Sequence, residues 1–186
     1  TGSELIKQPE LSKIAFTGST EVGRKIKKDL AGTGKSITLE LGGKSPFIIF
    51  DDADIDGAIE GLVDAIWLNQ GQVCCAGSRL LVQESIYAKV YKKLIARMKK
   101  LRVGNPLDKS IDMGAIISSE QFNKINSMVA ASVRDGAELF QCTLPNGLEG
   151  FYFPPSLINK VSPSMTIFQE EVFGPVLVCS TFRTPS

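Results

Sequence analysis

The sequence is organised around the stretch NQGQVCCAGSR, which runs from Asn69 to Arg79. Within it, Cys74 stands two places after a Gly-Gln pair, at the end of an apolar pattern with helical period. These surroundings are typical of a displayed thiol rather than a packed one. Such a thiol can act as a nucleophile if a base or an electropositive turn raises its reactivity. We therefore take Cys74 as the candidate nucleophile.

The base for this chemistry must be a carboxylate, because the 186 residues contain no histidine. The candidate is Glu40, in the stretch LELGGKSP that runs from Leu39 to Pro46. It stands between two leucines and just before a double glycine. A carboxylate held in an apolar strand usually has a raised pKa, which suits a general base near neutral pH.

Both residues also have an ordinary structural interpretation. A buried cysteine is most often a small, inert hydrophobic side chain. A glutamate flanked by leucines can be the solvent-facing residue of a half-buried strand. Taken singly, neither Cys74 nor Glu40 decides between the two interpretations.

Taken together, the two stretches resemble the signatures of the aldehyde dehydrogenase superfamily, in which the glutamate of LELGGK and the cysteine of GQxC form the catalytic pair. Two further segments match that family: FTGSTEVG at Phe16–Gly23 and EEVFGPV at Glu170–Val176. The four segments occur in the family's order and span nearly the whole chain. The segment Leu62–Cys75 is most similar to family sixteen of the superfamily.

The resemblance implies an oxidoreductase that converts a small-molecule aldehyde to a carboxylic acid with NAD or NADP. Cys74 would form a thiohemiacetal and then a thioester, and Glu40 would activate the water that releases the acid. The resemblance also implies that Glu171 binds the cofactor ribose and that Phe173 lies beside the nicotinamide ring. The other cofactor-binding positions that it implies are Gly18, Ser19, Thr20, Glu21, Val22, Gly23 and Leu41.

The glycine turn at Gly18 can also be interpreted from its residues alone. It joins an expected strand at Lys13–Thr17 to an expected helix at about Glu21–Leu30. Such a turn aims backbone N–H groups at an anion, commonly a nucleotide phosphate. An ordinary strand-to-helix turn would use the same residue types for conformational reasons. Because the sequence has no GxGxxG fingerprint, the dinucleotide assignment depends on the resemblance.

We expect an α/β, aldehyde dehydrogenase-like fold with two domains. Residues 1–42 are expected to be the C-terminal part of an NAD(P)-binding Rossmann-like domain, and residues 43–186 a catalytic domain truncated at its C-terminus. Alternating and helical hydrophobic patterns predict the other elements. The further strands are expected at Ser36–Leu41, Pro46–Phe50, Arg79–Gln83 and Val176–Phe182, and the further helices at Ile55–Trp67, Ile86–Leu101 and from Ser118 to about Asp135, with a surface turn at Cys142–Gly150.

The family places further segments before and after the region that resembles this chain. The first residue is not methionine, so we expect the sequence to begin partway through a larger protein or after a removed tag. An upstream asparagine for the oxyanion, an upstream lysine for the adenosine ribose and downstream oligomerisation strands have no counterpart here. We therefore expect the isolated chain to be inactive and its parent to be a homo-oligomer.

Composition argues against nucleic-acid-binding, membrane-spanning and metal-binding functions. The chain is 43% apolar and 22% charged, with a formal net charge of +1, so no long-range field favours nucleic acid or anionic lipid. No apolar run approaches the length of a bilayer span. With no histidine, a zinc site would need all four thiolates, and we expect no metal; the cysteines are Cys74, Cys75, Cys142 and Cys179. No signal peptide opens the chain and a nucleophilic thiol survives best in a reducing compartment, so we expect a cytoplasmic protein.

Two rival functions come from other classes. The chain could be a non-catalytic scaffold domain descended from a dehydrogenase, although retention of both Cys74 and Glu40 argues against this. The segment from Ser85 to Gly104 carries seven Lys or Arg and no acid, which could bind nucleic acid. Its apolar stripe accounts for the same spacing, which favours a solvated helix face.

Overall fold

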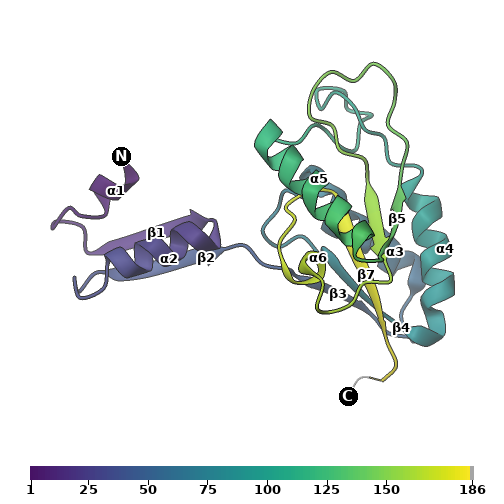
Figure 1. Cartoon of the computed structure of the whole chain (residues 1–186), viewed down its shortest axis with the longest axis horizontal. Helices are drawn as coiled ribbons and strands as arrows, with labels where there is room; N and C mark the ends of the chain where they lie inside the picture. The colour runs from purple at the N-terminus through teal and green to yellow at the C-terminus, as the bar shows by residue number, and fades with distance from the viewer. Residues whose placement is uncertain (185–186) are drawn as a thin grey trace. The chain divides into compact units, whose positions relative to one another are not determined.

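The computed structural model describes residues 1–184 and contains two compact units (Figure 1). Unit 1 is Thr1–Gly43, and unit 2 begins at Lys44. Both combine helices with parallel strand pairs, so the expected α/β fold class is confirmed.

Unit 1 is a strand–helix–strand arrangement preceded by a short helix. The elements are α1 (Gly2–Leu5), β1 (Lys13–Gly18), α2 (Thr20–Asp29) and β2 (Ser36–Leu41). Strands β1 and β2 are parallel, and Gly18 is paired with Leu41. Helix α2 begins after Ser19, whose Oγ accepts a hydrogen bond from the backbone N–H of Val22 at 3.3 Å. A small core around Ile6, Ile14 and Leu30 holds the helices on the strands.

Unit 2 is built on a five-stranded sheet with the order β3-β4-β7-β6-β5. All neighbouring pairs are parallel except β5 and β6, which are antiparallel. The last described strand in the chain therefore lies at the centre of the sheet. The strands are β3 (Pro46–Ile49), β4 (Arg79–Gln83), β5 (Glu138–Gln141), β6 (Ser156–Asn159) and β7 (Val176–Phe182).

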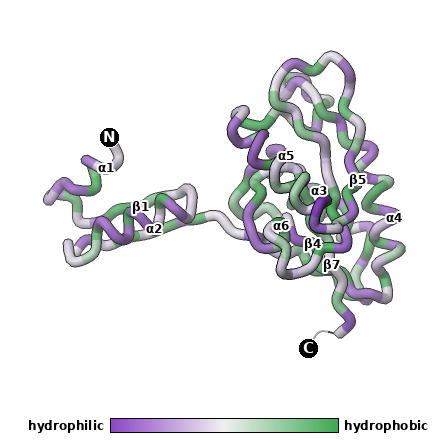
Figure 2. The backbone as a smooth tube through the Cα atoms, in the orientation of Figure 1, coloured by the Kyte–Doolittle hydropathy of each residue, from purple (hydrophilic) through white to green (hydrophobic). Residues whose placement is uncertain are grey.

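Helices cover both faces of this sheet. Successive side chains of β7 accordingly alternate between two hydrophobic cores. Leu177 and Cys179 belong to the core formed with α3 and α4, whereas Val176 and Val178 belong to the core formed with α5 and α6. Figure 1 shows α5 crossing in front of the strands, and Figure 2 shows hydrophilic and hydrophobic residues alternating along α4. The helices are α3 (Ile55–Trp67), η1 (Leu68–Gly71), η2 (Glu84–Ile86), α4 (Tyr87–Met98), α5 (Ser119–Arg134) and α6 (Thr166–Gln169).

Most predicted elements are present with small shifts at their ends. Helix α5 begins after Ser118, whose Oγ accepts from the N–H of Gln121 at 3.2 Å, as the capping pattern predicts. The helix expected over Ile86–Leu101 is shorter, because η2 precedes it and α4 ends at Met98. The segment 142–150 connects β5 and β6 without regular structure, as expected.

None of the helices in residues 1–184 combines the length and hydrophobicity needed to cross a bilayer. Within the same residues, no three His, Cys, Asp or Glu side chains gather into a group that would hold a metal ion.

Candidate active site

Cys74 lies in unit 2, in a turn between η1 and β4, and its side chain is exposed. Residues Asn69 and Gln70 adopt the left-handed region, with φ of 49° and 57°, and this reverses the chain after α3. A hydrogen bond of 3.1 Å from the N–H of Ala76 to the carbonyl of Val73 closes the turn around the thiol. The position at the end of α3 agrees with the sequence pattern.

Cys75 is exposed as well. Both cysteines lie in the same turn. Exposure alone therefore does not distinguish the two sulfurs.

Two glutamines tie the cysteine-bearing loop to a distant segment of the chain. Gln70 accepts from the N–H of Gly114 at 3.1 Å and donates to the carbonyl of Ala115 at 3.4 Å. Gln72 accepts from the N–H of Ile117 at 3.2 Å. No local sequence pattern indicates these contacts, because their partners are more than forty residues away.

The cysteine-bearing loop also packs against the EEVFGP segment. Gly71 has φ of 68°, and a β-carbon there would lie 2.2 Å from the carbonyl oxygen of Gly174. The indole N–H of Trp67 donates to the carbonyl of Pro175 at 3.2 Å. Two of the four signature segments are therefore brought together within unit 2.

The EEVFGP segment is itself held in an uncommon conformation. Phe173 is half-buried and has φ of 54°, a region that costs a non-glycine residue roughly 1–2 kcal/mol. The side-chain amide of Gln121 donates to the carbonyls of Val172 and Phe173, at 2.9 and 3.0 Å. This pair of bonds fixes the backbone on both sides of the strained peptide.

Glu171 presents a buried acceptor. Its Oε1 atom has no hydrogen-bond partner among residues 1–184. Buried carboxylate oxygens normally accept at least one hydrogen bond, so a donor is missing at this position. A hydroxyl group of a ligand such as a nucleotide ribose fits this requirement.

Glu40 lies on β2 in unit 1, paired with Thr17 of β1. Burial alternates along β2, and Glu40 is on the exposed side with Ser36 and Thr38. The expectation of a carboxylate buried in apolar surroundings is wrong, because the flanking leucines point to the opposite face from Glu40. Glu40 belongs to unit 1 and Cys74 to unit 2.

The glycine turn and the start of α2 form the rest of the candidate cofactor segment in unit 1. Gly23 is buried against Leu41, and a β-carbon at Gly23 would lie 2.6 Å from Leu41 Cδ2. Of the other positions, Thr20 is half-buried and Gly18, Ser19, Glu21 and Val22 are exposed. Gly23 thus sets how closely α2 approaches β2, in addition to any contact with a ligand.

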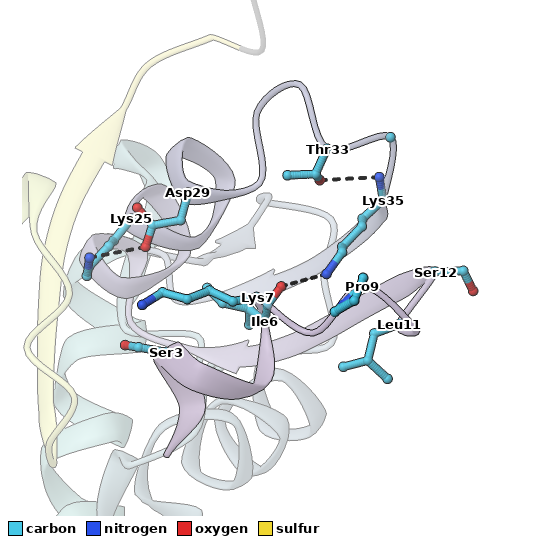
Figure 3. Close-up of a pocket in the computed structure, with 11 residues that line it drawn as sticks. Ser3, Ile6, Lys7, Pro9, Leu11, Ser12, Lys25, Asp29, Thr33 and Lys35 are labelled. Atoms are coloured by element: carbon cyan, nitrogen blue, oxygen red, sulfur yellow. Dashed lines mark hydrogen bonds and ion pairs between the residues drawn. The ribbon is translucent and has the colours of Figure 1, made fainter.

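A cavity of about 740 Å³ in unit 1 is separate from these signature residues (Figure 3). It is lined by Lys35, whose Nζ donates to the carbonyls of Ile6 and Gln8 at 2.8 and 2.5 Å. Lys25 and Asp29 form an ion pair at its wall, 3.1 Å apart. None of the predicted site residues lines it.

The fold and the signature segments can be compared with known proteins. The model of the aldehyde dehydrogenase family matches residues 1–186, and the chain belongs to this family. It is 42% identical over 185 residues to betaine aldehyde dehydrogenase 1 of Oryza sativa subsp. japonica, covering 98% of this chain and 37% of that protein. It is 44% identical over 188 residues to aminoaldehyde dehydrogenase 2 of Zea mays, covering 100% of this chain and 37% of that protein.

Solved structures give the same result. Betaine aldehyde dehydrogenase from Staphylococcus aureus, in complex with NAD⁺, has 41% sequence identity and a TM-score of 0.94, with 99% of this chain and 37% of that chain covered. An NAD-dependent aldehyde dehydrogenase from Sinorhizobium meliloti also has 41% identity and a TM-score of 0.94, with 98% and 37% covered. The chain thus spans 37% of the length of these relatives. The narrower similarity to family sixteen stays a prediction.

Proposed function

We propose that this chain is part of a longer NAD-dependent aldehyde dehydrogenase in which Cys74 is the nucleophile. The observation that carries the proposal is the packing of the exposed Cys74 loop against the segment that contains Glu171 and Phe173. A nucleophile and a cofactor-binding segment must lie close together in an enzyme that transfers hydride from a covalently bound substrate. Family membership and the NAD⁺ complex of a relative with 41% identity support the choice of cofactor.

In the proposed reaction, the Cys74 thiolate attacks the aldehyde carbon and holds the substrate as a thiohemiacetal. NAD⁺, which Glu171 and Phe173 would hold, would accept the hydride that leaves the adduct, and loss of this hydride gives a thioester. Glu40 takes a proton from a water molecule that attacks the thioester, and the carboxylic acid leaves while the thiolate is regenerated. The exposure of Glu40 on β2 suits this role, because a water molecule can reach its carboxylate.

The residues around the cofactor have separate proposed roles. Glu171 accepts hydrogen bonds from the ribose, and its unpartnered Oε1 is the atom available for this. Phe173 lies beside the nicotinamide, with its backbone fixed by Gln121. Residues 1–42, with the turn at 18–23 and Leu41, are the C-terminal part of the cofactor domain, and residues 43–186 carry the catalytic thiol.

Ion pairing supports a solvated surface for α4 rather than a nucleic-acid interface. Lys93 pairs with Asp56, and Arg97 pairs with Glu60 at 2.9 Å. Arg102, after the helix, pairs with Asp112 at 3.2 Å. Acidic neighbours reduce the positive potential that phosphate groups require. These ion pairs favour a solvated helix face. For the whole protein we propose an aldehyde substrate, a cytoplasmic location and a homo-oligomeric state, with no nucleic-acid or membrane partner.

The test compares two neighbouring thiols in the full-length protein. NADH formation is followed with a panel of short aldehydes for the native protein, Cys74→Ser and Cys75→Ser. We expect Cys74→Ser to abolish turnover, because a serine hydroxyl is a far weaker nucleophile near pH 7, and Cys75→Ser to keep most of it. Equal loss in both variants would reassign the nucleophile. A native protein without activity that nevertheless folds would favour the scaffold alternative.

A further inference from the structure

Three charged side chains in unit 2 have buried atoms without a hydrogen-bond partner among residues 1–184. The atoms are Lys44 Nζ, Arg79 Nε and Glu171 Oε1. Lys44 is only 9% exposed, which is rare for a lysine. Buried polar atoms without a hydrogen-bond partner are few in native proteins. Three such atoms, on two positively charged side chains and one negatively charged one, indicate a functional arrangement.

The backbone brings the three residues to one end of the sheet. Lys44 stands two residues before Pro46, which pairs with Arg79 in the β3–β4 register. The N–H of Arg79 donates to the carbonyl of Ser45 at 3.2 Å, which fixes the start of β4 beside the residue that follows Lys44.

Arg79 also reaches the segment that contains Glu171. Its guanidinium carbon lies 5.1 Å from the ring centroid of Phe168, a cation–π contact. Phe168 belongs to α6, which ends at Gln169, two residues before Glu171. The start of β4 thus contacts the helix that leads directly into the EEVFGP segment.

Electrostatic interactions link the same three groups. The pKa of Lys44 is lowered from 10.5 to about 8: burial is the largest cause, the positive charge of Arg79 acts in the same direction, and the negative charge of Glu171 opposes the shift. Arg79 and Glu171 are the charged groups that act on the Lys44 ammonium. The negative charge of Glu171 therefore favours the ammonium form of Lys44.

We propose that Lys44 is a positioning residue for cofactor binding: together with Arg79, its ammonium group holds the Glu171 carboxylate in the orientation that accepts a ribose hydroxyl. This inference rests on the proposed function, in which Glu171 binds NAD. Two neighbouring positive charges attract a carboxylate and restrict its orientation. Lys44 itself does not touch the reacting atoms.

The ammonium form of Lys44 sets the direction of the pH dependence. It is present below a pH of about 8 and is lost as the pH rises through that value. NAD affinity should therefore fall between pH 7 and pH 9 in the native protein.

The experiment measures the dissociation constant for NAD by calorimetry with the full-length protein at pH 7 and pH 9. Lys44→Met removes the charge and keeps the length, Lys44→Arg keeps a charge that does not titrate, and Lys92→Met is a control at an exposed lysine on α4. We expect about tenfold weaker binding at pH 7 for Lys44→Met, because the buried positive charge that attracts the Glu171 carboxylate is lost. Lys44→Arg should restore most of the affinity and lose the weakening at pH 9.

The outcomes separate this inference from the proposed function. If the native protein binds NAD and Lys44→Met binds it equally well at pH 7, the positioning role is wrong and the proposed function stands. If the native protein does not bind NAD at all, the proposed function fails and takes the inference with it. The melting temperature without NAD checks that Lys44→Met is folded, so that weaker binding reports the cofactor site.

Discussion

Gly71 and Gly174 are so close that a β-carbon on Gly71 would lie 2.2 Å from the carbonyl oxygen of Gly174. The same β-carbon would lie 2.9 Å from the carbonyl oxygen of Ile66. Both neighbours are backbone atoms, which cannot rotate away as a side chain can. The Cys74 loop can therefore pack this closely against the segment containing Glu171 and Phe173 only because residue 71 has no side chain.

Gly71→Ala is expected to destabilise unit 2 by about 2–5 kcal/mol, the sum of a left-handed alanine and an overpacked contact. Gly147→Ala is the matched control, because Gly147 has φ of 77° but nothing within 4 Å of an added β-carbon. That variant should lose only about 1–2 kcal/mol. Urea unfolding followed by the fluorescence of Trp67, the only tryptophan of the chain, gives both values. Equal losses of unfolding free energy in the two variants would mean that the Cys74 loop can move away from Gly174 without a cost in stability.

The four thiols should react with iodoacetamide in an order set by exposure and pKa. Cys74 and Cys75 are exposed, whereas burial raises the pKa of Cys142 and raises that of Cys179 to about 12. Since only the thiolate reacts, Cys179 should be labelled last at pH 8 and Cys142 before it. Mass spectrometry of peptides after timed labelling measures the order, and labelling in urea should abolish the differences. Early modification of Cys179 in the folded chain would contradict the buried position of β7.

Glu40→Gln should separate the two halves of the proposed reaction in the full-length protein. The first turnover, which forms the thioester, should keep its burst of NADH, because Glu40 acts afterwards on water. Steady-state turnover should fall roughly 10²-fold or more. Stopped-flow absorbance resolves both phases, with Glu10→Gln as a control at another exposed carboxylate of unit 1. A variant without any burst would place Glu40 in the acylation step instead.

Lys44 should make folding stability depend on pH in the direction opposite to cofactor affinity. Its pKa is lowered to about 8 in the folded chain from an ordinary value of 10.5, so the unfolded chain binds more protons between these values. Stability from this group therefore rises with pH above about 8, by up to roughly 1.4 kcal/mol per pH unit.

The measurement for this pH effect is the difference in unfolding free energy between the native chain and Lys44→Met. Taking the difference removes the contribution of other groups, such as Tyr87, whose pKa is raised to about 12 by burial. The difference should increase in favour of the native chain from pH 8 to pH 10. A difference that stays constant over this range would show that Lys44 is solvated in the folded state.

Local sequence signals predicted the elements of the fold well. The apolar period of Ile55–Trp67 and the cap at Ser118 depend on neighbours within a few residues, and both are present in the structure. The same holds for the glycine turn before α2, where Ser19 caps the helix. Such patterns are readable without knowing the tertiary fold.

The contacts of the candidate site were less predictable, because they join distant segments. Gln121 meets the carbonyl of Phe173 across fifty-two positions, and nothing near either residue indicates the pairing. The same long range hides the unpartnered atoms of Lys44 and Glu171, which are visible only once burial is known. The wrong expectation of a buried Glu40 assumed apolar surroundings for the carboxylate, whereas the alternation of β2 places Glu40 and its flanking leucines on opposite faces.

The central place of β7 has a consequence for the synthesis of the protein on the ribosome. Strand β7 joins β4 on one side to β6 on the other, yet it is the last strand of the described chain to be made. Until Val176–Phe182 has left the exit tunnel, the strand that pairs with both β4 and β6 is absent, and each of these strands lacks a neighbour on that side. Unpaired strand edges invite association with other chains. Ribosomes that stall before this strand should therefore release products that depend on chaperones.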